Sequence, residues 1–258
     1  MDISKRHDTP SLGRFLLTAP ILRREKEARL SGGLYHKLQI ELAYNSNHIE
    51  GSQLTRDQTR YIYETATVLP TDDGHGVRVA DIAEAYGHFR AFDAVIDQAE
   101  EPLTEEFIKY LHTLLFRGSP AADRDWFQVG KYKTLPNEVG DIVTTPPENV
   151  PSEMSALLEA YEADGSLPDF ADIVRFHAEF ERIHPFQDGN GRVGRLIMVK
   201  ECLRAGLTPV LIPEKNKAFY YRGLAEWARE PGYLLDTCRA GQDIVDEWID
   251  YFLPDLND

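Results

Sequence analysis

The sequence predicts an all-α protein interrupted by one small β-hairpin. Apolar residues recur mostly at spacings of three and four, helix-capping residues precede several of these runs, and no repeated alternation of strand and helix patterns occurs. Of the 258 residues, 42% are hydrophobic, which is enough for a chain of this length to bury a core. We expect a helical bundle without internal repeats or a flexible linker.

Apolar stripes and capping residues place the helices in order. Leu34, Leu38 and Leu42 recur at four-residue spacing, and Thr55 opens a capping-box sequence that ends at Gln58. A longer core-facing stripe consists of Val79, Ile82, Ala83, Tyr86, Phe89 and Ile96. Thr104 and Asp169 are caps for two further stripes, which are Phe107, Leu111, Leu114, Leu115 and Phe170, Ile173, Val174, Phe180, Ile183. The last helices are expected over 191–205, 215–227 and 234–253.

The segment 130–151 departs from the helical pattern. It carries four prolines, Gly140 and short β-prone pieces at 131–134 and 142–145. We expect an exposed hairpin there.

The charge and the cysteines exclude several classes of function. The 28 Lys and Arg against 43 Asp and Glu give a net charge of −15, which argues against a nucleic-acid or anionic membrane surface. Cys202 and Cys238 lie in no metal-type spacing and are expected to be buried thiols. No apolar run approaches the roughly 18 residues of a membrane span, so we expect a cytoplasmic protein without membrane contact.

The stretch His184-Pro185-Phe186-Gln187-Asp188-Gly189-Asn190-Gly191-Arg192-Val193-Gly194-Arg195 carries the chemistry. Pro185 favours the end of one helix, and Gly189 and Gly191 allow a tight turn into the next. The free amides at that helix N-terminus form an anion-binding nest, and Arg192 and Arg195 add charged contacts on its first turns. Phosphate is the natural ligand.

Asp188 and His184 flank this nest. A carboxylate beside phosphate oxygens is a usual ligand of Mg²⁺, although Asp188 could instead cap the helix. His184 can accept a proton from an attacking hydroxyl near pH 7, although a lone histidine is more often structural.

The same letters also satisfy a dinucleotide-binding pattern, GxGxxG over 189–194 with Glu214 twenty residues further on. That pattern requires a preceding strand, whereas here an amphipathic helix precedes it. We therefore set the dinucleotide interpretation aside.

The stretch 184–195 matches the signature of Fic-domain proteins, HxFx(D/E)GNGRxxR, at every defined position, and the chain resembles this family from about Thr104 to Phe252. The resemblance implies an N-terminal helical region over 1–103 and a Fic-type core over 104–258, with a hairpin flap near 130–151. Most proteins of this family transfer AMP from ATP to a hydroxyl of a target protein.

The resemblance also implies roles for individual residues. His184 would deprotonate the target Ser, Thr or Tyr, Phe186 would anchor the loop, and Asp188 would coordinate Mg²⁺. Arg195 would bind the γ-phosphate of ATP. The other phosphate contacts would come from Gly189, Asn190, Gly191 and Arg192. Relatives that act as kinases carry lysine in place of Gly191, so AMP transfer is favoured.

A second match lies upstream, where Ser46-Asn47-His48-Ile49-Glu50-Gly51 resembles the (S/T)xxxE(G/N) inhibitory motif of a subclass with an inhibitory helix before the core. Ser46, Glu50 and Gly51 are its defined positions. The alternative is an ordinary helix end with Gly51 after the cap.

Other expectations concern the ligand pocket and the partners. Asn216, Tyr220 and Tyr221 are candidates for an adenine pocket, although aromatic residues at that spacing are more often core. The flap would hold an extended segment of a protein substrate, and Lys133 stands where many relatives have arginine. Self-modification and a homo-oligomer stay open.

The leading hypothesis is a self-inhibited protein adenylyltransferase. Removal of AMP by the same site, with Glu50 orienting water, and a non-catalytic nucleotide-sensing module are the alternatives. A DNA-binding regulator is disfavoured by the charge of −15.

Overall fold

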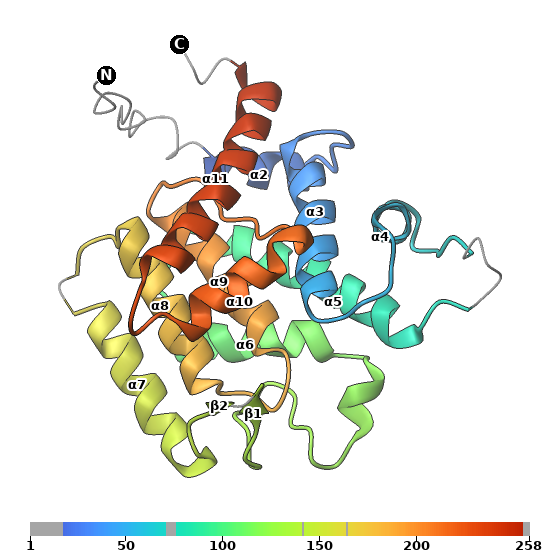
Figure 1. The fold of residues 1–258 in the computed structure, drawn as a ribbon. Helices are drawn as coiled ribbons and strands as arrows, with labels where there is room; N and C mark the ends of the chain where they lie inside the picture. The colour runs from blue at the N-terminus through green and yellow to red at the C-terminus, as the bar shows by residue number, and fades with distance from the viewer. Residues whose placement is uncertain (1–17, 71–75, 141, 164, 255–258) are drawn as a thin grey trace.

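The computed structural model describes residues 18–70, 76–140, 142–163 and 165–254, and these form helices around a buried central helix (Figure 1). The predicted all-α class is confirmed. The α-helices are α2 (Thr18–Glu27), α3 (Leu34–Ile49), α4 (Arg56–Thr65), α5 (Val79–Asp97), α6 (Glu105–Phe116), α7 (Val150–Tyr161), α8 (Phe170–Ile183), α9 (Asn190–Arg204), α10 (Lys217–Ala225) and α11 (Gly232–Phe252). Short 3₁₀ turns occupy Pro120–Asp123, Pro147–Asn149 and Glu214–Asn216.

The capping residues predicted from the sequence are the N-caps of their helices in the structure. Thr55 accepts a hydrogen bond from the backbone N–H of Gln58 at 3.1 Å, and the Gln58 side chain accepts one from the Thr55 N–H at 2.9 Å. Asp169 caps α8 through the N–H of Asp172 at 2.8 Å, and Thr104 caps α6. These bonds satisfy amides that a helix start leaves without partners.

Helix α9 is the centre of the molecule and carries the signature residues on its first turns. All of its residues except Gly191 are buried, and it packs against α8, α5, α6 and α3. Its polar side chains therefore need partners. Deep in the helix, Glu201 pairs with Lys200 at 2.8 Å and with Arg204. The signature residues at the start of α9 are thus part of a buried helix that is surrounded by other helices.

The structure corrects several expectations. Val79 and Tyr86 are 69% and 53% exposed, so the stripe assigned to α5 is core-facing only in part. Helices α2 and α7 were not predicted from the sequence. Helix α7 begins within the proline-rich segment, and its Pro151 lies in the first turn, where a helix tolerates proline.

The hairpin segment contains a short antiparallel pair. Strand β1 (Glu138–Val139) pairs with β2 (Ile142–Val143), and Glu138 lies opposite Val143. The predicted piece at 131–134 is not a strand. Its backbone bonds elsewhere, since the N–H of Lys133 donates to the carbonyl of Pro185 at 2.8 Å.

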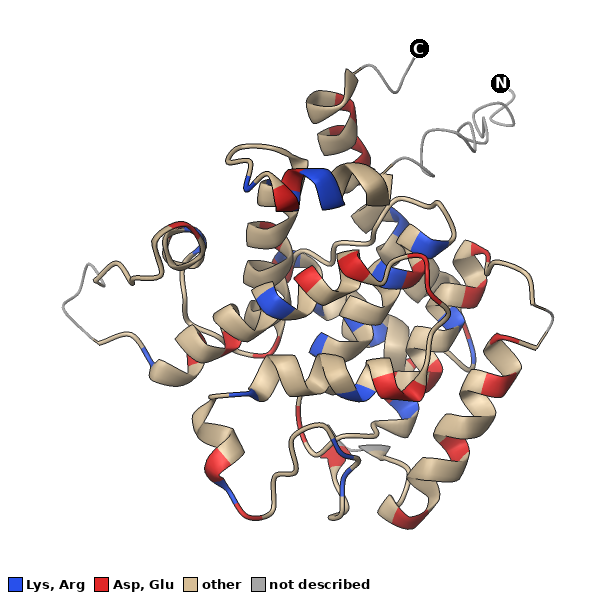
Figure 2. Cartoon of the chain, turned by 180° about the vertical axis from the view of Figure 1, so that it is seen from behind, with Lys and Arg blue, Asp and Glu red and all other residues tan. Residues whose placement is uncertain are grey.

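The acidic surface of α7 and the two buried thiols are as expected from the net charge of −15 and the cysteine spacing. Acidic residues are spaced along α7 with no Lys or Arg among them (Figure 2). Cys202 and Cys238 are both buried and free. Among the residues that the structure describes, no helix combines the length and apolar character needed to cross a membrane.

Gly87→Ala should destabilise the fold, because α5 and α6 touch at this position. A Cβ added to Gly87 would lie 2.4 Å from the carbonyl oxygen of Leu115, and backbone cannot rotate away. We expect a loss of roughly 1–3 kcal/mol in the free energy of unfolding, measured by urea denaturation. Tyr86→Ala, on the exposed face of the same helix, is the control and should change it by about 0.5 kcal/mol or less. Equal effects of the two substitutions would contradict this account of the helix contact.

Candidate active site

The loop between α8 and α9 is a tight turn held from both ends. His184 ends α8 in the left-handed region, with φ 52° and ψ 62°, and its N–H donates to the carbonyl of Phe180 at 2.9 Å. Gly189 opens α9 with φ 81°. A Cβ at Gly189 would lie 2.3 Å from the ring of Phe116, so this position requires glycine both for conformation and for space.

Phe186 fixes the middle of this loop. Its side chain is fully buried and stacks on His112 with ring centroids 4.1 Å apart. The Asn190 side chain accepts from the N–H of Phe186 at 2.7 Å and donates to its carbonyl at 2.9 Å. Because the side-chain amide of Asn190 already bonds to the backbone of Phe186, the predicted phosphate contact of Asn190 would have to come from its backbone N–H.

His112 joins the signature loop to the segment that leads into the hairpin, a role that the sequence analysis did not predict. Its Nδ1 accepts from the N–H of Gly130 at 2.8 Å, and its Nε2 lies 3.2 Å from the carbonyl of Asp188. Burial lowers the pKa of His112 to about 3, so it is neutral and can accept at one nitrogen and donate at the other. In the sequence, the one indication of this role is a histidine among the apolar residues of α6.

His184 presents one ring nitrogen for chemistry. Its Nδ1 lies 3.3 Å from the backbone carbonyl of Glu181, which favours a proton on Nδ1 and leaves Nε2 as the acceptor. Burial lowers the pKa of His184 to about 4, the backbone contact opposes the change, and the nearby Lys133 cation reinforces it. His184 is therefore uncharged at neutral pH, as a general base must be.

Asp188 lies at the mouth of the turn with its carboxylate 60% exposed. One oxygen accepts from the N–H of Gly189 at 2.6 Å and lies 3.6 Å from Arg192 Nη2. No group of three or more His, Cys, Asp or Glu side chains arranged for a metal occurs among the described residues. A single exposed carboxylate beside a phosphate nest nonetheless fits Mg²⁺, which is usually held by one or two carboxylates, water and substrate phosphates.

Arg192 is nearly enclosed, with its side chain 3% exposed. Its guanidinium stands 4.9 Å from the ring centre of Phe116, and its Nη1 pairs with Glu84 of α5 at 2.9 Å. Glu84 was not predicted, because nothing in the local sequence indicates that α5 meets the start of α9. The pair fixes the direction of the Arg192 guanidinium.

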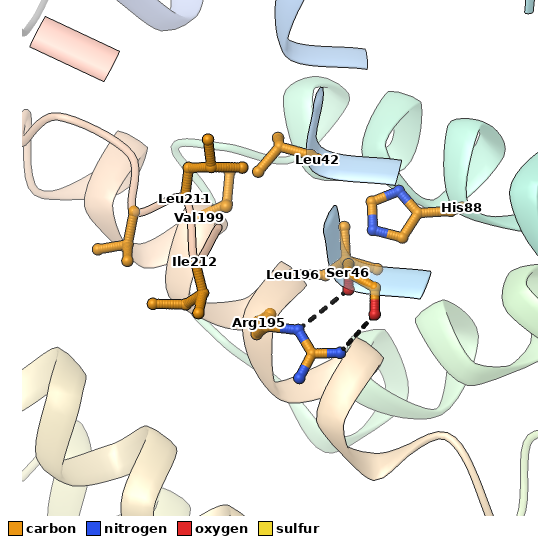
Figure 3. Close-up of a pocket in the computed structure, with 9 residues that line it drawn as sticks. Leu42, Ser46, His88, Arg195, Leu196, Val199, Leu211 and Ile212 are labelled. Atoms are coloured by element: carbon orange, nitrogen blue, oxygen red, sulfur yellow. Dashed lines mark hydrogen bonds between the residues drawn. The ribbon is translucent and has the colours of Figure 1, made fainter. Parts of the chain in front are cut away.

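Arg195 of the signature stretch 184–195 contacts the upstream motif 46–51 through Ser46 (Figure 3). Its Nε donates to the Ser46 hydroxyl at 3.0 Å, and its Nη2 donates to the Ser46 carbonyl at 3.0 Å and to Glu50 at 2.7 Å. Burial disfavours the Glu50 carboxylate, but the charge and hydrogen bond of Arg195 outweigh it and hold the pKa of Glu50 below its usual range. The adjoining cavity, lined by Leu42, His88 and Leu196 among others, has a volume of only about 10 Å³.

The glycines of both motifs fit this contact. A Cβ on Gly191 would lie 2.3 Å from a Glu50 carboxylate oxygen, so the signature leaves room for the glutamate. Glu50 is the C-cap of α3, and Gly51 follows with φ 98°. Residues 46–51 are therefore both the end of α3 and a contact with Arg195, because the C-cap position of α3 places Glu50 beside Arg195.

The three adenine-pocket candidates do not form one exposed surface. Tyr220 is 1% exposed, and its hydroxyl lies 2.7 Å from Nε2 of His177, so the predicted contact with adenine would require this side chain to become uncovered. Tyr221 is 39% exposed and donates to the carbonyl of Ile49 at 3.3 Å, while Asn216 is the partly buried N-cap of α10. The burial of Tyr220 is what the alternative interpretation, a core aromatic residue, also predicts, and its role in adenine binding stays a prediction.

Lys133 holds the base of the hairpin against the signature loop. Its Nζ donates to Asn137 at 2.7 Å, to the Thr144 hydroxyl at 2.6 Å and to the carbonyl of Ile183 at 3.4 Å. Burial lowers its pKa to about 8. This lysine therefore connects both sides of the hairpin to the residue that precedes His184.

A helix N-terminus that presents glycines, two enclosed arginines and a histidine has the features of an anion-binding site suited to phosphate groups. Residues 102–202 match the Fic/DOC family, so the chain carries a Fic/DOC domain over these residues.

Named relatives and solved structures agree with this assignment. The chain is similar to Protein adenylyltransferase Fic of Nematostella vectensis, with 30% identity over 189 residues, which cover 70% of this chain and 41% of that protein. It is similar to the protein of the same name in Drosophila grimshawi at 28% identity, covering 81% and 42%. A Fic domain containing signaling protein from Bacteroides thetaiotaomicron has a TM-score of 0.69 and 28% identity, covering 95% of this chain and 91% of the other. The chain spans about two fifths of the length of the two adenylyltransferases.

Proposed function

We propose that the protein is an adenylyltransferase that moves AMP from ATP to a Ser, Thr or Tyr hydroxyl of a target protein and that Glu50 restrains it. The observation that carries the proposal is the 2.7 Å contact between Glu50 and Arg195, formed by a signature residue and a motif 145 positions upstream. The names of the two relatives support the reaction class.

The proposed step uses one proton acceptor and one phosphate site. Nε2 of His184 takes the proton of the target hydroxyl, whose oxygen bonds to the α-phosphorus of ATP. The bond from that phosphorus to the bridging oxygen breaks, and pyrophosphate leaves. The amides at the start of α9, Arg192 and Arg195 stabilise the charge on the phosphates. Mg²⁺, held by Asp188, would add charge neutralisation on the phosphate oxygens.

The hairpin is the proposed docking site of the target. Its β2 residue Val143 is 72% exposed, and the nearby Leu135 is 46% exposed, so apolar side chains are available beside a two-stranded sheet whose outer edges pair with no other strand of the described residues. An extended target segment could pair with such an edge through its main chain. Lys133 keeps this edge close to His184, which brings the target hydroxyl to the base.

The proposal predicts which phosphorus of ATP is transferred. Label on the α-phosphorus should reach the protein or a target, label on the γ-phosphorus should not, and removal of Mg²⁺ by a chelator should abolish the transfer. Labelling from the γ-position alone would identify a kinase instead. The measurement is autoradiography of the full chain incubated with each ATP, with Glu50→Gly used to release the restraint.

A further inference from the structure

Glu181 is a largely buried acid beside His184 that the proposed step does not use. It lies one turn earlier on α8, and its carboxyl oxygen Oε2 is 3.8 Å from Nδ1 of His184 with the side chain 11% exposed. Its other oxygen, Oε1, has no hydrogen-bond partner among the described residues. A buried carboxyl without a donor costs stability, so a purely structural role would be served better by an apolar side chain.

The space for this carboxyl comes from the signature helix. A Cβ on Gly194 would lie 2.5 Å from Glu181 Oε1 and 2.9 Å from Nδ1 of His177, another buried atom without a partner in the described part of the chain. The ring of His177 is in turn bound through Nε2 to the Tyr220 hydroxyl. Glu181 therefore lies between His184 and a neutral polar pair, with glycine opposite.

The charges around Glu181 come from three other helices. Burial raises the pKa of Glu181 to about 8, Arg195 of α9 opposes this, and Glu50 of α3 reinforces it. Tyr220 of α10 faces it as a neutral hydroxyl, and His177 on its own helix is neutral because burial lowers its pKa to about 3. Lys133 is the cation that faces His184 from the hairpin side.

We propose that Glu181 is a positioning residue for His184, whose carboxyl lies at the Nδ1 side of the imidazole and, when ionised, stabilises the imidazolium that forms as Nε2 takes the hydroxyl proton. This inference rests on the proposed function for its catalytic consequence. Its structural content, the coupling between the two side chains, does not depend on AMP transfer.

The sign of the pH effect follows from the ionisation of the carboxyl. Below about pH 8 Glu181 is protonated and uncharged, so it adds nothing to the basicity of His184. Above that value a negative charge stands 3.8 Å from the ring and raises the affinity of Nε2 for a proton. The transfer rate should therefore rise as the pH passes through about 8.

The first test follows the ring resonances of His184 by NMR between pH 6.5 and pH 9.5 in the unliganded full chain. The wild type should show an inflection near pH 8, although His184 itself does not titrate there, and Glu181→Gln should abolish it. Because Lys133 also titrates near pH 8, Lys133→Arg is the matched variant, and the inflection should persist in it. Absence of the inflection in the wild type, its persistence in Glu181→Gln or its loss in Lys133→Arg would overturn the coupling.

The second test measures AMP transfer in the Glu50→Gly background. Adding Glu181→Gln should lower kcat about tenfold at pH 9, which corresponds to the lower end of the pKa change that a neighbouring opposite charge causes, and by a smaller factor at pH 6.5, with the KM for ATP unchanged. Glu179→Gln, which removes a partly exposed carboxylate from the same helix, should leave kcat at the parent value at both pH values. A loss of equal size at both pH values would indicate a structural role and refute the positioning role. If no variant transfers AMP, the proposed function fails, and the NMR titration still decides the coupling.

Discussion

His184→Ala should lower AMP transfer by about 10²- to 10⁴-fold, the usual contribution of a general base, while ATP binding changes little. The reason is the division of labour in the site. The proposed phosphate contacts come from α9, whereas His184 ends α8 and touches Glu181 rather than a proposed phosphate ligand. Transfer is measured with α-labelled ATP in the Glu50→Gly background, and ATP binding is measured by calorimetry.

His36→Ala is a matched control for this variant. The His36 side chain is 15% exposed against 17% for His184, and it pairs with Glu64 at 3.1 Å on the α3 and α4 side of the molecule. It should keep the parent rate. Near-parent transfer by His184→Ala, or a comparable loss in both variants, would remove His184 from the catalytic role.

The local parts of the site could be predicted from the sequence because their determinants are contiguous. The turn of 184–189 follows from Pro185 and Gly189, and the caps at Thr55 and Asp169 depend on residues three positions apart. Short-range chemistry of this kind needs no knowledge of packing. The contact between Glu50 and Arg195 was reached only through the resemblance to a family, because no spacing rule relates positions 145 residues apart.

The residues that were missed or misplaced depend on packing between helices. Glu84 meets Arg192 only because α5 lies against α9, and His112 reaches the loop only because α6 lies beneath it. Tyr220 was a candidate for the adenine pocket because it follows the signature stretch in the sequence. It is buried because His177, on α8, supplies a partner for its hydroxyl. In each case the deciding partner lies on a helix distant in the sequence.

Glu50→Gly should raise the rate of AMP transfer by roughly 10- to 150-fold. Arg195 is the proposed γ-phosphate ligand, and in this structure its Nη2 is occupied by Glu50 at 2.7 Å and by the Ser46 carbonyl at 3.0 Å. A charged hydrogen bond of this kind is worth about 1.5–3 kcal/mol, which corresponds to that range in the population of the competent state. Removing the carboxylate frees the donor and the space that the phosphate needs.

Acidification is a poor way to obtain the same release. The pKa of Glu50 is held below its usual range, so its pairing with Arg195 is complete above that pKa and is lost only as the pH falls through it. Any activation by mild acid would therefore have to come from another group. Glu50→Gln separates charge from shape, because it keeps the side-chain length and removes the charge, and it should give a smaller gain than glycine.

ADP and the double variant test whether the gain acts through Arg195. ADP has no γ-phosphate to compete with Glu50, so its affinity should change much less than the transfer rate. Combining Glu50→Gly with Arg195→Ala should lose the gain, since the donor that Glu50 occupied is then absent. Transfer by Glu50→Gly at the wild-type rate would mean that 46–51 is only the end of α3 and that the ion pair does not limit the reaction. A gain retained in the double variant would mean instead that Glu50 acts by filling the space beside Gly191, where its carboxylate oxygen lies 2.3 Å from the position of an added Cβ.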